Sequence, residues 1–497
     1  MTDQMRSNGW ADLYGWELDR GSDVPLFRQI FTQVRTAILA GALKPDTKLP
    51  SSRAMAERLG VARTSVVAAF DQLLAEGYVE SRRGSGTFVG VDLGGLPRIS
   101  PRHRKPGIAK SSSTPRMRRA FQDFERATVQ AEARPFNTGR TLMDARTVET
   151  WRKITNQVMR SPRNDHLGYT DPRGLVGLRQ NLCEYLRAAR AVRCDPEQIM
   201  VTAGTQHAID IAIRVLLEPN DEVWVEEPGY PLTHAQLVLA KMRPSPIPVD
   251  PQGIVVDAGI RIAPRARAAF ITPSHQFPTG VVLSMARRLE LLSWARENDA
   301  FIIEDDYTSE FRYSGPPLSS LQGLDDSERV IYIGTLNKAL FPGLRLGYAV
   351  VPHALLPVFL RARYLMDRQP PSLQQAVVAE FMQQGYFTAH IRRMRHAYCE
   401  QRDALVATLK RRAGDHLKID MPDQGMHLVA YLANGLADTA IESDARAAGI
   451  VVHAISRFYR SRSTRSGLML GFSGFPQAQI VPAAARLGAL ITRRAAS

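Results

Sequence analysis

The segment PRISPRHRKPGIAKSSSTPRMRR, residues 97–119, limits the fold of this chain more than any other stretch. It contains eight lysines or arginines, four prolines and three consecutive serines, and it has no acidic residue. A stretch of this composition cannot bury a core. We therefore expect residues 92–133 to be a basic, flexible linker between separate units: an N-terminal extension (1–24) and a short unit (25–91) before it, and a large unit (134–497) after it.

The overall charge narrows the class of partner. The 497 residues include 64 Lys+Arg against 49 Asp+Glu, a formal net charge of +15. This positive charge favours a nucleic-acid partner, although a basic soluble enzyme would carry a similar charge. Cys183, Cys194 and Cys399 form no CxxC pair, so we expect no disulfide framework and no metal site. Without a signal sequence or a run of about 20 apolar residues, the chain is expected to be cytoplasmic, with no membrane partner.

The short unit has the pattern of three helices followed by a hairpin. Apolar residues at every fourth position predict the first helix, between Pro25 and Gly41. Ser51 and Ser52 are N-cap candidates for a second helix that ends at Gly60. A third helix, from about residue 62 to 76, is expected to bury Val66, Phe70, Leu73 and Leu74. Two β-prone runs, 78–81 and 87–91, flank the turn RRGSG, so we expect a winged helix-turn-helix.

Polar side chains of this unit lie where such a module reads DNA. Arg63, Thr64 and Ser65 begin the third helix, whose N-terminal end reaches base edges in the major groove. Arg53 begins the second helix and can donate two hydrogen bonds to guanine or phosphate. Glycines in the wing allow close approach to the DNA backbone. The wing residues are Arg82, Arg83, Gly84, Ser85 and Gly86.

The stretch LPSSRAMAERLGVARTSVVAAFDQLLAEGYVESRRGSGTFV resembles the GntR class of bacterial regulators over its whole length. The resemblance includes PSSR, the Gly-Val-x-Arg turn and the Gly-rich wing. It implies that two such modules, in a homodimer, bind two half-sites of a double-stranded operator.

After the linker, apolar β-prone runs alternate with helical segments. The runs are QIMVTAG, DEVWVEEP, AAFITPS, AFIIEDDY and RVIYIGT. Buried strands separated by helices predict an α/β domain with a mostly parallel sheet. The length of this unit also allows a smaller C-terminal subdomain.

The large unit contains a candidate for each part of a pyridoxal phosphate site, which needs a lysine, an acid at the pyridinium nitrogen, a donor to the ring phenolate and a phosphate cradle. Lys338 follows the run VIYIG, at a strand end where ligands bind in open α/β sheets. Asp305 ends AFIIEDDY, where its carboxylate can stay ionised beside the pyridinium, and Tyr307 points to the same side. Glu304 and Asp306 then face the opposite side and are structural.

The phosphate cradle is expected at a turn between a strand and a helix. Gly204, Thr205 and Gln206 form this turn, where backbone amides and the helix dipole favour an anion. Thr335 and Arg345 flank Lys338 and add a hydroxyl and a positive charge. Tyr230 in EEPGY is a candidate to stack on the ring, with a core tyrosine as the alternative.

Residues 134–497 resemble a fold-type I aminotransferase, and the complete chain resembles the MocR family of GntR regulators. The resemblance covers about nine tenths of the chain and rests on YTDPRGLVGLR, VTAGTQHAID, EEPGYP, TPSHQFPTG, EDDYTSEFRY, GTLNKALFPGLRLGY, GMHL and GLMLGF. It implies that Lys338 forms the Schiff base with pyridoxal 5'-phosphate. It also implies that Tyr169 reaches the phosphate of the neighbouring subunit of a homodimer.

Two positions depart from the aminotransferase pattern. In place of Asn-Pro-Thr-Gly the chain has QFPTG, so the asparagine contact to the ring is in doubt, and His275 or Gln276 are the candidates to replace it. The arginine that binds a substrate carboxylate aligns with Met469, whose thioether cannot form that pair. The nearby basic residues could supply another anion site, but a solvated loop is the favoured interpretation. These residues are Arg457, Arg460, Arg462 and Arg465.

Together these features favour a regulator over an enzyme, with at most residual transaminase activity. The leading hypothesis is a homodimer that binds operator DNA and senses pyridoxal phosphate or an amine effector through an aldimine at Lys338. The loss of the arginine favours pyridoxal phosphate itself over an amino acid. The alternatives are a working aminotransferase with an accessory DNA-binding module and a large unit that is only a cofactor-free dimerisation scaffold.

Overall fold

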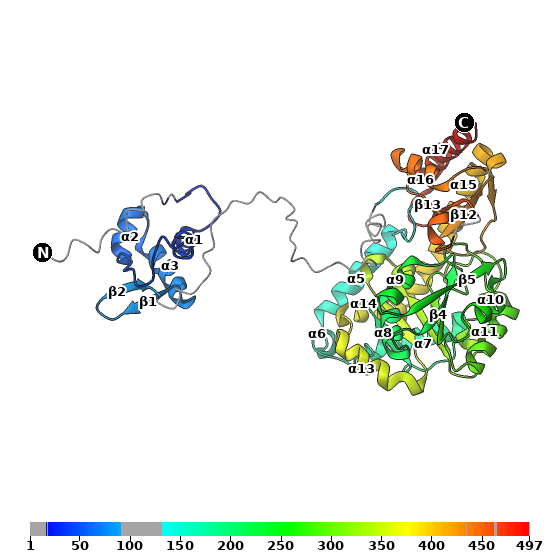
Figure 1. Ribbon diagram of the computed structural model, residues 1–497, viewed down its shortest axis with the longest axis horizontal. Helices are drawn as coiled ribbons and strands as arrows, with labels where there is room; N and C mark the ends of the chain where they lie inside the picture. The colour runs from blue at the N-terminus through cyan, green and yellow to red at the C-terminus, as the bar shows by residue number, and fades with distance from the viewer. Residues whose placement is uncertain (1–15, 17, 91–131, 434, 462–464, 497) are drawn as a thin grey trace. The chain divides into compact units, whose positions relative to one another are not determined.

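The computed structural model describes residues 16, 18–90, 132–433, 435–461 and 465–496, which belong to two compact units (Figure 1). The expected linker, 92–133, lies almost entirely outside the described residues, as do most of the N-terminal extension and Arg462. In the part of the chain that the structure describes, no helix has the length and apolar character needed to cross a membrane.

The small unit is the expected winged helix. Its elements are α1 (Leu26–Leu39), α2 (Ser52–Leu59), α3 (Arg63–Ala75), β1 (Val79–Arg82) and β2 (Gly86–Val89). The Ser51 hydroxyl accepts a hydrogen bond from the Ala54 amide at 3.2 Å and caps α2, and Gly60 ends it in the left-handed region. The two strands pair antiparallel, with Arg82 opposite Gly86, and form the wing.

The core of this unit corrects one expectation. Val66, Phe70 and Leu73 are buried as expected, but Leu74 is 37% exposed. At about 100° per residue, Leu74 points about 40° further round the helix than Phe70, so it lies at the edge of the inward face and is partly exposed.

The large unit is built on a mixed sheet of eight described strands in the order β3-β10-β9-β8-β7-β4-β5-β6. Strands β5, β4, β7, β8 and β9 run parallel to their neighbours in this series, whereas β10 is antiparallel to both β3 and β9. The mostly parallel sheet is therefore confirmed. The strands are β3 (Ile199–Thr202), β4 (Glu222–Glu227), β5 (Arg243–Asp250), β6 (Gly253–Ile254), β7 (Ala268–Ile271), β8 (Phe301–Asp306), β9 (Val330–Thr335) and β10 (Gly347–Val350).

Helices cover this sheet and pack apolar side chains against it. The tightest aromatic pair is Trp224 of β4 and Trp294 of α11, whose rings stack at 3.8 Å. The helices are α5 (Ala145–Arg160), α6 (Asn164–Leu167), α7 (Val176–Arg190), α8 (Thr205–Leu216), α9 (Pro231–Leu239), α10 (Val256–Ile262), α11 (Met285–Glu297), α12 (Leu336–Ala339), α13 (Leu356–Met366) and α14 (Ser372–Gln383).

A C-terminal subdomain follows, at one end of the large unit in Figure 1. Its described strands form an antiparallel sheet in the order β11-β12-β14-β13. They are β11 (Leu417–Ile419), β12 (His427–Leu432), β13 (His453–Ala454) and β14 (Gly467–Gly471), with helices α15 (Tyr386–Ala413), α16 (Asp438–Ala447) and α17 (Gln477–Ala495). Short 3-10 turns lie at Gln322–Leu324, Pro342–Leu344, His353–Leu355, Gly414–His416 and Ile455–Phe458.

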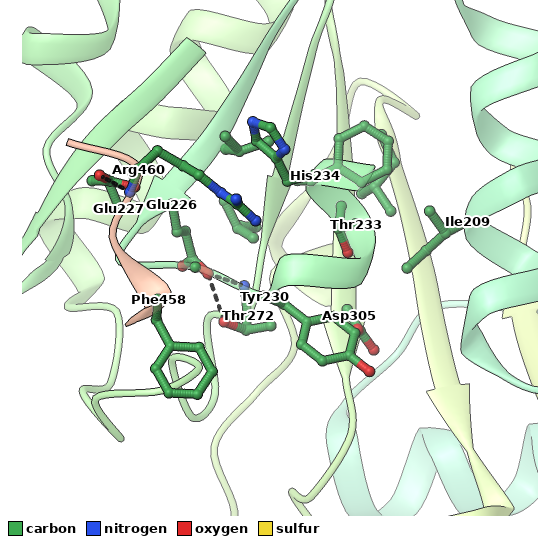
Figure 2. Close-up of a pocket in the computed structure, with 15 residues that line it drawn as sticks. Ile209, Glu226, Glu227, Tyr230, Thr233, His234, Thr272, Asp305, Phe458 and Arg460 are labelled. Carbon is green, nitrogen blue, oxygen red and sulfur yellow. Dashed lines mark hydrogen bonds between the residues drawn. The ribbon is translucent and has the colours of Figure 1, made fainter. Parts of the chain in front are cut away.

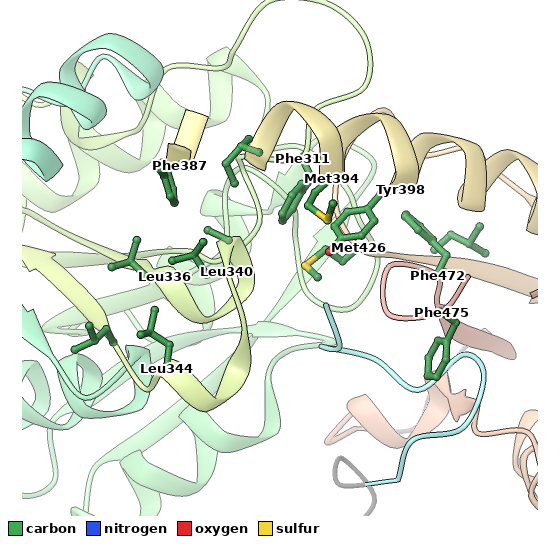
Figure 3. Packing of buried hydrophobic residues seen from close by; sticks show 14 of the residues in the cluster. Phe311, Leu336, Leu340, Leu344, Phe387, Met394, Tyr398, Met426, Phe472 and Phe475 are labelled. Atoms are coloured by element: carbon green, nitrogen blue, oxygen red, sulfur yellow. The ribbon is translucent and has the colours of Figure 1, made fainter. Parts of the chain in front are cut away.

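One continuous apolar cluster joins the subdomain to the short helix α12 (Figure 3). Leu336 and Leu340 lie at the α12 end of this cluster, and Met426 and Phe472 lie at the subdomain end. Because both ends belong to one packed core, α12 is held firmly between the large sheet and the C-terminal subdomain.

Candidate functional site

Lys338 lies on α12, a single helical turn that follows β9. The Thr335 hydroxyl accepts a hydrogen bond from the Asn337 amide at 3.1 Å and caps this turn. Buried Leu336 and Ala339 fix the opposite side of the turn in the core. The Lys338 amine donates a hydrogen bond to the backbone carbonyl of Gly139 at 2.9 Å.

Asp305 and Tyr307 lie where β8 ends, between β7 and β9. The neighbouring acids face the other way, as expected: Asp306 accepts hydrogen bonds from Arg190 at 2.8 Å and from Tyr332 at 2.7 Å. Glu304 accepts the backbone amides of residues 321 and 322, both at 2.9 Å. These pairings leave Asp305 as the acid that faces Lys338.

The pocket shifts the pKa of its acid and of its amine toward neutrality. Burial raises the pKa of Asp305 to about 7, with further contributions from Asp306 and Glu226, while Lys338 opposes the shift. Burial also lowers the pKa of Lys338 to about 8, helped by Arg345 and opposed by Asp305. The expectation that Asp305 stays ionised therefore depends on the positive charge of a pyridinium beside it.

The turn 204–206 has the form of a phosphate cradle. Gly204 is the N-cap of α8 and has φ +100°, and an added Cβ there would lie 3.1 Å from the Asn337 amide nitrogen. The same Cβ would lie 3.6 Å from the Arg345 guanidinium, which donates to the Ala203 carbonyl at 3.1 Å. The turn, the start of α8 and Arg345 thus converge, a combination that favours an anion.

Two of the buried side-chain atoms without a hydrogen-bond partner among the described residues belong to Asp305 and to the turn 204–206. They are Asp305 Oδ1 and Gln206 Nε2. Buried polar atoms are normally paired, so unpaired atoms beside a cradle and a lysine indicate that the pocket is shaped for a polar ligand. The pyridinium, aldehyde and phosphate groups of pyridoxal phosphate would fit Asp305, Lys338 and the turn 204–206, in this order.

Tyr230 and the acid Glu226 lie beside Asp305. Figure 2 shows the Tyr230 ring next to Asp305 at a cavity of about 40 Å³ that Glu226, Thr272 and other side chains line. Burial raises the pKa of Glu226 to about 7, although Thr272 donates to its carboxylate at 2.6 Å. Glu226 was not predicted from the sequence. Its position inside EEPGY, near the end of β4, is the signal that could have identified it.

The two candidates for the missing asparagine behave differently. The Gln276 amide is already used, since it donates to the Pro228 carbonyl at 2.8 Å and accepts from the Thr279 hydroxyl at 2.6 Å. His275 instead contacts the Tyr307 hydroxyl through Nδ1 at 3.0 Å.

Met469 lies in an apolar cluster of the C-terminal subdomain, and its role as the counterpart of the carboxylate-binding arginine stays a prediction. It is 1% exposed on β14 and packs with Val429 and Ile455. The upstream arginines are dispersed: Arg457 pairs with Glu442 at 2.5 Å, Arg465 lies over the Tyr431 ring at 5.0 Å, and Arg460 lines the cavity of Figure 2.

Tyr169 is not part of the pocket of its own chain. It is 80% exposed, and Arg368 lies over its ring at 4.5 Å. An exposed aromatic residue in this position suits the expectation that it serves a neighbouring subunit, and that expectation stays a prediction.

In the small unit, the candidate DNA-reading residues share one end of α2 and α3. Arg53, Arg63 and Thr64 are exposed and Ser65 is half-buried. The Arg63 Nε donates to the Ser52 hydroxyl at 3.3 Å, so the two helix starts are in contact. In the exposed wing, Arg82 pairs with Asp46 at 2.6 Å and with Glu80 at 2.5 Å, and it lies over the Phe88 ring at 4.4 Å.

Two sequence families match the chain. Residues 26–89 match the bacterial regulatory proteins of the gntR family, and residues 135–480 match aminotransferase class I and II. The chain is 41% identical over 460 residues to the probable rhizopine catabolism regulatory protein MocR of Rhizobium meliloti, covering 92% of each. It is 30% identical to the pyridoxine biosynthesis transcriptional regulator PdxR of Corynebacterium glutamicum, covering 89% of this chain and 91% of that protein.

Two solved structures that resemble this chain are aminotransferases. One is the α-aminoadipate aminotransferase LysN of Thermus thermophilus, complexed with N-(5'-phosphopyridoxyl)-L-leucine. It is 26% identical with a TM-score of 0.66, covering 73% of this chain and 92% of that chain. Another is the kynurenine aminotransferase of Pyrococcus horikoshii, 27% identical with a TM-score of 0.67, covering 74% and 93%.

Proposed function

Because the chain belongs to the MocR family of gntR-type transcriptional regulators, with a fold-type I aminotransferase-like unit behind its winged helix, we propose that it controls transcription in response to pyridoxal phosphate. The cofactor is held covalently at Lys338. The regulator binds operator DNA as a homodimer, and pyridoxal phosphate, or an amine that reacts with it, changes the affinity of that homodimer for the operator.

The observation that carries this proposal is the convergence of the pocket residues in a chain that also has a winged helix. Lys338 faces Asp305, and Arg345 approaches the turn at Gly204. In this arrangement Asp305 would hold the pyridinium, the turn and Arg345 would hold the phosphate, and Tyr230 would stack on the ring. When bound, the cofactor supplies an aldehyde that captures an amine.

The apolar cluster at Met469 supports a particular class of effector. A free amino acid needs a cation for its α-carboxylate, and buried Met469 offers none. Pyridoxal phosphate itself needs only the cradle and the lysine, so it is the effector that this pocket fits best. The name of PdxR refers to pyridoxine biosynthesis and that of MocR to rhizopine catabolism, so relatives of this chain are linked to different metabolites.

Regulation requires that the effector bind two arrangements of the homodimer with different affinity. The exposed Tyr169 is the residue that we assign to the neighbouring pocket, so cofactor occupancy and the dimer interface would be coupled. The winged helices of the two subunits would then meet the half-sites with a geometry that depends on occupancy.

Two experiments test this function. The first is the visible absorption spectrum of the purified protein, followed by borohydride reduction and peptide mapping, which should place the cofactor on Lys338. The second is a gel-shift titration of the DNA beside the chain's own gene, with and without pyridoxal phosphate. Wild type should respond to the cofactor and Lys338→Ala should not. Absence of specific binding under both conditions would refute the regulatory role.

A second candidate function, an active aminotransferase, is favoured by one observation. Lys338, Asp305 and Tyr307 are all present, so the electronic parts of amino-group transfer are in place. Against it, Met469 removes the handle that orients an amino acid. Rapid conversion of the bound cofactor to its amine form by common amino acids would favour the enzyme. A purified protein with no cofactor absorption would instead favour a dimerisation scaffold.

A further inference from the structure

The Tyr307 hydroxyl has one hydrogen and two possible acceptors for it. The proposed function uses this hydrogen for the phenolate oxygen of the cofactor. In the structure, however, the hydroxyl oxygen lies 3.0 Å from Nδ1 of His275. A neutral imidazole donates from one nitrogen and accepts at the other, so the tautomer of His275 decides where the Tyr307 hydrogen points.

The far edge of His275 is closely packed. A Cβ added to Gly425 would lie 2.3 Å from Nε2 of His275, and one added to Gly280 would lie 3.2 Å from it. The His427 ring meets His275 edge-on, with centroids 4.9 Å apart. Among the described residues, Nε2 makes no hydrogen bond. The contact with Tyr307 is therefore the side-chain hydrogen bond that holds this ring beside the pocket.

Burial keeps the imidazole neutral. It lowers the pKa of His275 well below the usual value, and His427 adds to this effect, while the Gln424 backbone carbonyl opposes it. The ring then has two neutral tautomers. With the proton on Nε2, Tyr307 must donate to His275, and the ring then competes with the cofactor for the Tyr307 hydrogen. With the proton on Nδ1, the ring donates to the Tyr307 oxygen and leaves the Tyr307 hydrogen free for the cofactor.

We propose that His275 is a positioning residue, whose Nδ1–H donates to the Tyr307 oxygen and thereby directs the Tyr307 hydrogen into the cofactor pocket. This inference rests on the proposed function. Neighbouring side chains cannot take over the role, because the Gln276 amide is engaged in its own loop and Phe277 has no donor. Tyr307, held by His275, is then the phenol donor to the cofactor's phenolate oxygen.

The test is a pH titration of the visible band of the full-length protein loaded with pyridoxal phosphate. A donor to the phenolate oxygen stabilises negative charge there, so the bound cofactor loses its proton at a lower pH. The variants are His275→Phe, which keeps a flat ring without a donor, and His275→Asn, whose amide nitrogen can occupy the place of Nδ1. His275→Phe should raise the apparent pKa of the band by about one unit, and His275→Asn should restore most of it.

Tyr307→Phe provides the matched control. It should raise the pKa of the band at least as much as His275→Phe, and adding His275→Phe to it should cause no further shift, because the pair acts in series. An unmoved band in a folded His275→Phe protein, with a shifted band in Tyr307→Phe, overturns this inference alone. If His275→Phe does not fold, His275→Ala takes its place, and an unmoved band in that folded variant overturns the inference. Absence of any band in wild type refutes the proposed function as well.

Discussion

The two units of this regulator differ in whether their functional charged groups are exposed or buried. In the winged helix, Arg53 and Arg63 stand exposed at the starts of two helices. In the large unit, Lys338 and Asp305 lie in a pocket where burial moves both pKa values toward neutrality. A surface of exposed charges recognises a polyanion over long distances and weakens with salt. A pocket of suppressed charges responds to one small molecule at contact distance.

From this difference we expect the winged helix to bind DNA and the large unit to bind the small molecule. The substitution with the largest expected effect tests this division of roles. Replacing Lys338 with alanine removes the nitrogen to which we propose that the cofactor is joined, so the visible band and the borohydride adduct should be lost completely. Operator affinity without pyridoxal phosphate should stay within about twofold of wild type, because the winged helix is untouched. Absorption spectroscopy and gel shifts of the same preparation measure both. A persistent adduct on another residue would break the assignment.

The reverse separation is expected for Arg63→Ala. Loss of a base or phosphate contact costs about 1–3 kcal/mol, or roughly 5- to 150-fold in operator affinity, whereas the cofactor spectrum should not change. Fluorescence anisotropy with a labelled operator gives the affinity. Arg152→Ala is the control, because Arg152 is exposed on α5 and pairs with Glu149. An equal loss in both variants would mean that total charge, and not the helix starts, sets DNA affinity.

The shifted pKa of Lys338 predicts how fast the cofactor attaches as pH changes. Only the neutral amine attacks an aldehyde, so the attachment rate should rise about tenfold per pH unit below a midpoint of about 8 and level off above it. Arg345→Gln should move this midpoint upward, because removal of a nearby positive charge favours the protonated amine. Stopped-flow absorbance follows the reaction.

The control for that profile is Arg214→Gln, since Arg214 lies exposed on α8 and pairs with Asp210. Its midpoint should equal that of wild type. A wild-type profile with a midpoint near 10 would show that the pocket does not suppress the charge of Lys338, and the contrast between the two units would disappear.

The smallest expected effect is in the wing. Its two adjacent arginines differ in their side-chain contacts. Arg82 is held by Asp46, Glu80 and the Phe88 ring, and Arg83 is exposed beside it. Arg83→Ala should weaken operator binding a few-fold and reduce the salt slope by about one. Arg82→Ala should chiefly lower thermal stability, and only slightly, because exposed ion pairs contribute little. Salt titrations and thermal unfolding distinguish them, and the opposite ranking would identify Arg82 as the DNA contact.

The sequence predicted the winged helix almost completely, because its signals are local. Ser51 and Gly60 mark the ends of α2 by capping and by backbone freedom, and both lie where expected. The predicted burial of Leu74 was wrong, because Leu74 lies at the edge of the apolar helix face and is partly exposed. The alternating runs likewise predicted the central strands, whereas the antiparallel strands of the C-terminal subdomain were not predicted individually.

The sequence predicted which residues belong to the pocket, but it did not predict the contacts that join distant segments of the chain there. Asp305 and Lys338 could be identified from their places at strand ends. The contacts of Lys338 with Gly139 and of Tyr307 with His275 join segments that are 199 and 32 residues apart, and no local pattern encodes them. The position of Glu226 inside EEPGY was visible in the sequence, but its burial was not, because it depends on the pairing of β4 with β7 and on the hydrogen bond from Thr272, which follows β7.

The hydrogen bond from Lys338 to Gly139 gives the pocket a way to report its chemical state. A free lysine amine has two or three hydrogens, but a lysine nitrogen doubly bonded to carbon keeps at most one. The covalent attachment that we propose would therefore take hydrogen-bond donors away from the carbonyl of Gly139. Gly139 belongs to the described stretch nearest the expected linker, and its neighbours are separately tied to the C-terminal subdomain through Phe136 and Arg140. Under the proposed function, bond formation at the Lys338 nitrogen would weaken one of the contacts that hold the segment around Gly139 against the rest of the large unit.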